Sequence, residues 1–78
     1  MTIPINVPRL GFSMTEGTLI EWIIPDGGRA QEGEALYIIE TDKVENEVAA
    51  PATGTLRHLA SPGETLDVGA PLGEIEPG

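Results

Sequence analysis

The sequence has 78 residues, no cysteine, a single histidine and a formal net charge of −9, which comes from four basic and thirteen acidic residues. A chain this short forms one domain with a thin core, so we interpret residues 1–78 as a single domain. Without cysteine there is no disulfide framework or thiolate metal site, and the lone His58 gives no basis for a metal centre. The negative charge argues against binding to nucleic acid or to anionic membranes, and it favours encounters with basic partner surfaces.

Nothing in the sequence directs the chain to a membrane or out of the cell. No apolar run approaches the roughly 20 residues needed to span a bilayer. The first residues, Met1-Thr2-Ile3-Pro4, lack the basic and apolar regions of a secretion signal. These features predict a cytoplasmic location, with a processed mitochondrial form as the weaker alternative because the sequence starts at Met1.

Short β-rich runs separated by glycine and proline follow one another along the chain. Ile3, Ile5 and Val7 occupy every second position, which is typical of a half-buried strand. The nearly continuous apolar run from Leu19 to Ile24 predicts a strand that is covered on both faces. No long stretch keeps a helical apolar stripe without a glycine or proline. The predicted strands are residues 3–7, 18–24, 35–41, 45–50, 55–59 and 72–76, with shorter pieces near 29–30 and 66–67.

The two halves of the sequence resemble one another. Gly17-Thr18-Leu19 recurs as Gly54-Thr55-Leu56, at an offset of 37 residues. At an offset of 36, five more residues recur: Gly27, Gly33, Leu36, Ile39 and Glu40 match Gly63, Gly69, Leu72, Ile75 and Glu76. Two copies are too few for a stacked solenoid. The repeat therefore predicts an all-β fold with pseudo-two-fold symmetry, a flattened barrel or sandwich of two four-stranded antiparallel sheets. The alternative is that short glycine patterns recur by chance in a glycine-rich β protein.

The joint between the two halves falls at Thr41-Asp42-Lys43-Val44, where the last strand of the first half would turn into the first strand of the second. Lys43 is the only lysine in the sequence, and acidic residues precede and follow it. An isolated lysine in an acidic chain is ordinarily a solvated countercharge or the guard of a strand edge. A lysine at the tip of a protruding hairpin, in contrast, presents a primary amine suited to amide formation with a carboxylic-acid cofactor.

The residues around Lys43 resemble the attachment motif of lipoyl domains. These domains belong to the biotinyl/lipoyl attachment family and occur in the acyltransferase subunits of 2-oxo acid dehydrogenase complexes. The motif here is Glu40-Thr41-Asp42-Lys43-Val44. The similarity runs from about Ile5 to Ile75 and also rests on the segment Pro8–Thr18, on Gly27 and Gly54 at their spacings from the lysine, and on Ala50–Gly54.

The resemblance implies that Lys43 carries lipoate through an amide and that the domain itself catalyses nothing. The fold would be a barrel-sandwich hybrid that presents a swinging arm of about 14 Å between the lysine backbone and the reactive sulfur. The implied partners are a lipoate-attaching enzyme, a thiamine-diphosphate-dependent 2-oxo acid decarboxylase, an acyltransferase core and a dihydrolipoyl dehydrogenase. The sequence leaves open which 2-oxo acid the complex uses. A free-standing carrier and the N-terminal domain of an acyltransferase subunit both fit it.

The resemblance also gives expectations for the residues near Lys43. Asp42 and Val44 match the motif and are expected to help the attaching enzyme recognise the turn, although turn geometry alone also favours aspartate. The segment Leu10–Glu16 is expected to pack near the lysine turn and to influence partner choice. Within that segment, Phe12 and Met14 are the candidates for setting partner choice, although either could simply cover the core. Glu40, Glu45 and Glu47 are expected to form a solvated face. Trp22 and Tyr37 are expected to pack in the core.

Three other functions are weaker alternatives. A biotin carrier domain has the same fold, but its motif places methionine on both sides of the lysine, where this chain has Asp42 and Val44. A cofactor-free interaction module would use the same sandwich with an unmodified lysine, but related adaptors interrupt the joint with a long helical hairpin. An enzyme has little support, because Ser13, Ser61 and His58 show no spacing that suggests a catalytic triad.

Overall fold

The computed structural model describes residues 2–9, 15–41 and 44–77. These residues contain eight strands and no helix, and hence no helix that is long and apolar enough to cross a membrane. The strands are β1 (Ile3–Asn6), β2 (Glu16–Trp22), β3 (Arg29–Ala30), β4 (Ala35–Thr41), β5 (Val44–Ala49), β6 (Gly54–His58), β7 (Thr65–Asp67) and β8 (Pro71–Glu76). Every strand predicted from the sequence is present, with its ends shifted by at most two residues.

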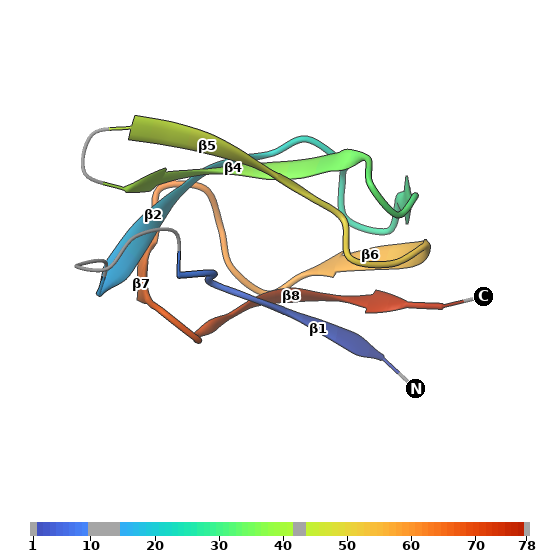
Figure 1. Ribbon diagram of the computed structural model, residues 1–78. Coiled ribbons are helices and arrows are strands. Elements are labelled where there is room, and N and C mark those ends of the chain that lie inside the picture. Colours follow the sequence, from blue (N-terminus) through green and yellow to red (C-terminus); the bar gives the residue numbers. More distant parts are fainter. Residues whose placement is uncertain (1, 10–14, 42–43, 78) are drawn as a thin grey trace.

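The strands form two four-stranded antiparallel sheets that pack face to face (Figure 1). One sheet has the order β1-β8-β6-β3 and the other has the order β5-β4-β2-β7. No ladder joins the two sheets among the described residues, so the predicted sandwich is confirmed while a closed barrel is not formed. Burial of a large apolar side chain stabilises a fold by about 1.5–3 kcal/mol. The largest fully buried side chains are Tyr37, Leu19, Leu36, Ile39, Leu56, Leu72 and Ile75.

A pseudo-two-fold relation exchanges the two sheets, as the repeat predicts. Strands β1, β8, β6 and β3 correspond in this order to β5, β4, β2 and β7. The pairings match residue by residue: Ile75↔Ile3 corresponds to Ile39↔Asn46, and Gly73↔Ile5 corresponds to Tyr37↔Val48. The repeat is therefore structural and not a chance recurrence of short glycine patterns.

A β-bulge in β2 explains why the repeat changes its offset. Leu19 pairs with Ile39, and the next pair is Glu21 with Ile38, so Ile20 is an extra residue in β2. The corresponding pairing of β6 with β8 has no such irregularity. One inserted residue in the first half shortens the offset from 37 before the bulge to 36 after it.

The bulge also corrects the prediction for the run from Leu19 to Ile24. The strand is not covered on both faces along this run, because it ends at Trp22 and Ile23 is 41% exposed. The inserted residue shifts the inward-outward alternation by one position. As a result Leu19 and Trp22 both pack on the core, while Glu21 between them is exposed.

Glycines at equivalent places close the turns of both halves. Gly27, Gly33, Gly63 and Gly69 have φ between 83° and 94°, a region that glycine enters without the steric penalty of a side chain. The turn hydrogen bonds are equivalent too: the amide of Gly27 donates to Leu56 O at 2.7 Å, and that of Gly63 donates to Leu19 O at 2.7 Å. These glycines recur in the sequence because the backbone requires them.

Candidate functional site

The β4–β5 hairpin contains the predicted modification site. The two strands pair from Ala35↔Ala49 to Thr41↔Val44, and the two residues between the last pair are Asp42 and Lys43. Asp42 and Lys43 lie outside the described residues, as do Phe12 and Met14. The expectations for these four residues are therefore untested. Val44, which the motif also includes, is 58% exposed, so an approaching protein can reach it.

The hairpin end lies at one extreme of an elongated molecule that measures 36 × 20 × 20 Å. Figure 1 shows the meeting point of β4 and β5 at the opposite end from the start of β1 and the end of β8. The symmetry imposes this arrangement, because the pairing of β4 with β5 corresponds to the pairing of β8 with β1. Where the first half has its hairpin, the other half has the two ends of the chain.

One side-chain amide spans the end of the hairpin. Asn46 Nδ2 donates to Thr41 Oγ1 at 3.3 Å and to the carbonyl oxygen of Val44 at 3.3 Å. Thr41 and Val44 are the last paired residues before the segment that holds Lys43. Sequence reasoning missed Asn46. The available signal was its polarity within the inward-facing row of Val44, Asn46 and Val48.

The sheet that contains the hairpin is acidic. Glu40 and Glu45 stand directly opposite one another in the ladder, where like charges repel. Glu45 and Glu47 are exposed, as expected, and Glu40 is half-buried. The four strands of this sheet contain no lysine, arginine or histidine, and their carboxylates are Glu16, Glu21, Glu40, Glu45, Glu47 and Asp67.

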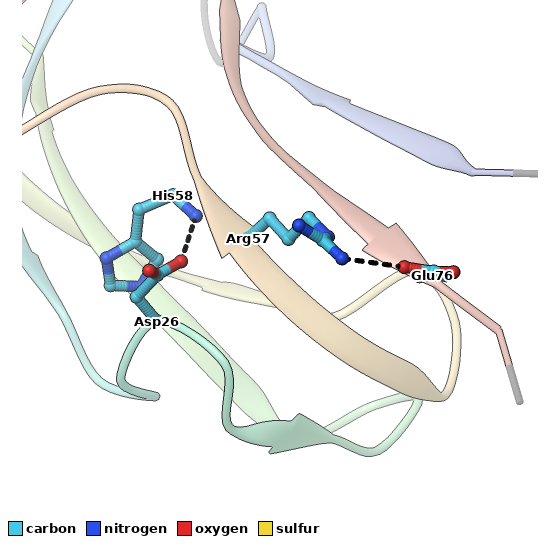
Figure 2. Close-up of polar contacts among 4 residues, drawn as sticks. All are labelled: Asp26, Arg57, His58 and Glu76. Atoms are coloured by element: carbon cyan, nitrogen blue, oxygen red, sulfur yellow. Dashed lines mark hydrogen bonds and ion pairs between the residues drawn. The ribbon is translucent and has the colours of Figure 1, made fainter.

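The other sheet has balanced charges. Its carboxylates are Glu74 and Glu76, and its arginines are Arg29 and Arg57. Arg57 Nη2 forms an ion pair with Glu76 Oε2 at 3.1 Å on the exposed face (Figure 2). The two sheets thus share a backbone plan but differ in surface charge.

The rings of Trp22 and His58 meet between the two sheets. The two residues occupy equivalent positions, and their rings stack with centroids 4.2 Å apart and an interplanar angle of 11°. Their ring nitrogens make equivalent contacts: Trp22 Nε1 donates to Ala60 O at 3.0 Å, and His58 Nε2 lies 2.9 Å from Ile24 O. Because a carbonyl oxygen only accepts, His58 Nε2 must carry the proton.

The backbone around His58 is held in place as well. Its amide donates to Asp26 Oδ1 at 2.8 Å, which ties β6 to the turn after β2 (Figure 2). The lone histidine therefore serves as a contact between the halves. Ser13, one of the two serines considered for a catalytic triad, lies outside the described residues. Within the described segments, no three histidine, aspartate or glutamate side chains are grouped so that they would hold a metal ion.

Tyr37 and Trp22 pack in the core, as predicted. Tyr37 is only 1% exposed, and its ring centroid is 5.5 Å from that of Trp22. Burial raises the pKa of Tyr37 to about 12, so its hydroxyl stays neutral at physiological pH. Tyr37 also borders an apolar groove of about 200 Å³ between β1 and β5, where its neighbours are Pro4, Ile5, Asn6, Pro8, Val48, Ala49 and Pro51. Among the described residues that line the groove, Tyr37 is the one with an ionisable side chain.

A symmetric sandwich with a lysine between the paired ends of β4 and β5 is the arrangement expected of a carrier module. Comparison with known proteins supports this class. The profile of the biotin and lipoyl attachment family, described as "Biotin-requiring enzyme", matches residues 3–75. The chain belongs to this family.

The similar proteins are acyltransferase components and a lipoyl domain. The chain is 43% identical over 76 residues to the dihydrolipoyllysine-residue acetyltransferase component of the acetoin cleaving system of Cupriavidus necator. It is 40% identical over 75 residues to the dihydrolipoyllysine-residue succinyltransferase component of the 2-oxoglutarate dehydrogenase complex of Staphylococcus saprophyticus. These matches cover 96% and 95% of the chain but 20% and 18% of the relatives. The chain thus spans about a fifth of their length.

A solved structure agrees with the sequence matches. The lipoyl domain of the 2-oxoglutarate dehydrogenase complex of Azotobacter vinelandii superposes with a TM-score of 0.79 at 35% identity, and the match covers 97% of this chain and 99% of that one. The predicted resemblance is therefore confirmed. The chain is a lipoyl domain, and the curated relatives that it matches are acyltransferase components.

Proposed function

We propose that Lys43 carries the lipoyl group and that the domain shuttles acyl groups and reducing equivalents between the active sites of a 2-oxo acid dehydrogenase complex. The observation that carries this proposal is the place of the sequence's single lysine, between Thr41 and Val44, the last paired residues of the β4–β5 hairpin. A hairpin end at the extreme of the molecule offers its side chains to several enzymes in turn, which a residue in a flat sheet face does not.

The residues present fit the attachment chemistry. An amide needs a primary amine, and Lys43 Nζ is the only lysine amine of the chain. When ATP activates the carboxyl group of lipoate as lipoyl adenylate, with release of pyrophosphate, the neutral amine of Lys43 bonds to the carboxyl carbon and AMP leaves. The nitrogen gives up one proton in this step and keeps one hydrogen, so the ammonium form loses two protons overall. The product is a neutral amide, so the attachment removes one positive charge. The attached dithiolane supplies the acyl-transfer and redox chemistry, and the protein supplies its position.

The partners follow from the same proposal. They are a lipoate-attaching enzyme, a thiamine-diphosphate-dependent decarboxylase, an acyltransferase core and a dihydrolipoyl dehydrogenase. The relatives come from acetoin, 2-oxoglutarate and pyruvate systems, which supports the class of complex without selecting the substrate. Tethering to such a complex would raise the effective concentration of the carrier at each active site. The cytoplasmic location remains a prediction from the sequence.

Intact mass spectrometry tests the proposal. The purified domain is incubated with lipoate, ATP and a lipoate ligase, with Lys43→Arg treated in parallel. We expect a single lipoyl increment in the wild type and none in Lys43→Arg, because arginine keeps the charge but has no acylatable amine. Modification of Lys43→Arg would overturn the assignment of the site.

A parallel incubation with biotin ligase separates the related carrier class. The expected result is no biotinyl increment. If the wild type gains a biotinyl group but no lipoyl group, the domain is a biotin carrier and the proposed lipoyl function is wrong. A folded wild type that accepts neither cofactor would instead be a cofactor-free interaction module.

A further inference from the structure

Asn46 is a polar residue at a core-facing position, where an apolar residue is usual. It pairs with Ile39, which is completely buried, so its side chain lies on the inner face of the sheet. Two residues further along β5, Val48 packs against the core from the same face. An amide that is half-buried in such a row costs stability unless its polar atoms are hydrogen-bonded.

The contacts of Asn46 fix the orientation of its amide. Nδ2 lies 3.3 Å from the carbonyl oxygen of Val44 and 3.3 Å from Thr41 Oγ1. A carbonyl oxygen only accepts, so the nitrogen and not the oxygen of the amide must face Val44. One amide group thus joins the last residue of β4 to the first residue of β5.

The second half of the molecule shows that the fold does not need this amide. The position equivalent to Asn46 is Ile3, because Ile75 pairs with Ile3 as Ile39 pairs with Asn46. At that position the strands β8 and β1 lead to the chain ends, and the residue is aliphatic. The amide occurs in the half where the strands lead to the hairpin segment with Lys43.

We propose that Asn46 is a positioning residue for the modification of Lys43, a role that rests on the proposed function of that lysine. By cross-linking Thr41 and Val44, Asn46 limits the conformations that the ends of β4 and β5 can adopt. An attaching enzyme then loses less conformational entropy when it binds the hairpin. The effect belongs to recognition of the domain, so it acts on KM more than on kcat.

The test replaces Asn46 with the residue of the other half, Asn46→Ile. With saturating lipoate and ATP, we expect the KM of the ligase for the domain to rise about three- to tenfold, the equivalent of roughly one ordinary hydrogen bond. The kcat and the thermal midpoint should stay close to those of the wild type, because isoleucine fits the inward row. The matched control is Asn6→Ile, which changes the sequence's other asparagine, on β1 in the opposite sheet, and should leave KM unchanged.

A second variant keeps the test decisive if Asn46→Ile is poorly folded. Thr41→Val removes one acceptor of the amide at nearly constant volume, and we expect it to raise KM by part of the same factor. In the double variant the two effects should be less than additive, because both remove the same contact.

The outcomes separate the positioning role from the site itself. If the wild type gains no lipoyl group at Lys43, the proposed function fails, and the positioning role fails with it. If the wild type is modified but both variants keep its KM, only the role of Asn46 is overturned. A fall in thermal midpoint without a change in KM would mean that Asn46 is purely structural.

Discussion

The two sheets share a backbone plan but differ in surface charge, because one is acidic and the other is balanced. Their strand orders and their pairings correspond, down to the turns that Gly27 and Gly63 close. The sheet with the hairpin nevertheless contains six carboxylates and no basic residue, whereas its counterpart sets two arginines against two carboxylates. Some inward-facing positions hold the same residue in both halves, as Leu19 and Leu56 do, whereas others differ, as Tyr37 and Gly73 do. The outward-facing positions differ in their charge. The comparison separates what the fold requires from what the hairpin end has in addition.

The core provides the largest test of equivalence. Leu19 and Leu56 occupy corresponding positions, and both are completely buried. We expect Leu19→Ala and Leu56→Ala each to lower the free energy of unfolding by about 2–5 kcal/mol, through lost burial and the cavity left behind. Urea unfolding followed by far-ultraviolet circular dichroism gives both values. Losses that differ by more than about 2 kcal/mol would show that one half dominates the core.

A gentler pair of changes covers the case in which the alanine variants do not fold. Ile39 and Ile75 are also equivalent and completely buried. Ile39→Val and Ile75→Val should each cost about 0.5–1.5 kcal/mol. Their agreement or disagreement tests the same equivalence at lower risk.

The stacked pair between the halves comes next in size. Trp22→Phe keeps an aromatic ring but removes the donor to Ala60 O, and His58→Ala removes the stacking partner and the contact with Ile24 O. We expect each change to cost about 1–2 kcal/mol, because a largely buried carbonyl loses its partner. The double variant should cost less than the sum, since the rings support one another. Strict additivity would mean that the stacking contributes nothing to stability.

Tyr37 makes the two halves differ in their response to alkali. Its equivalent is Gly73, which has no side chain to ionise. Burial raises the pKa of Tyr37 from 10.0 to about 12 in the folded protein, so the folded state holds the phenolic proton more tightly than the unfolded state. The contribution to stability is complete below pH 10 and is lost as the pH rises toward 12, because the unfolded chain ionises first.

Unfolding midpoints in urea across this pH range measure the effect. They should fall more steeply above pH 10 in the wild type than in Tyr37→Phe. The absorbance of the phenolate in the native protein should titrate near 12. Because Tyr37 is the only tyrosine of the sequence, a native titration near 10 would show directly that the ring is accessible to solvent.

Sequence reasoning predicted the strands because their signals are local. Alternating apolar residues and turn glycines mark the elements, and the repeat at offsets of 36 and 37 implies the symmetry. The change of offset indicates one inserted residue between Leu19 and Gly27. It does not show that the insertion is a bulge at Ile20, because any residue of the apolar run could be the extra one. The equivalence and the ring stacking of Trp22 and His58 could not be predicted either, because the offset changes somewhere between Leu19 and Gly27. The bonds of Asn46 depend on a diagonal cross-strand contact that only the register reveals. The role of Lys43 rests on its motif and stays a prediction.

The smallest expected effect is the sharpest test of the surface contrast. Glu40 and Glu76 are equivalent residues, yet Glu40 faces Glu45 across the ladder while Glu76 forms an exposed ion pair with Arg57. The same substitution should therefore have opposite signs. Glu40→Gln relieves a like-charge pair and should stabilise the domain by about 0.2–1 kcal/mol, whereas Glu76→Gln loses a surface ion pair and should destabilise it by a similar amount.

Ionic strength provides the control for this pair of variants. Arg57, Glu76 and Glu45 are exposed and Glu40 is only half-buried. Salt therefore screens both interactions, and the unfolding midpoints of the variants should move toward that of the wild type between about 0.1 M and about 1 M salt. If Glu40→Gln destabilised the domain at low salt, the repulsion between Glu40 and Glu45 would be absent in solution, and the acidic sheet would tolerate its charge at no cost. If Glu40→Gln stabilises the domain and Glu76→Gln destabilises it, the carboxylate of Glu40 lowers the stability of the domain. The presence of Glu40 is then not explained by stability.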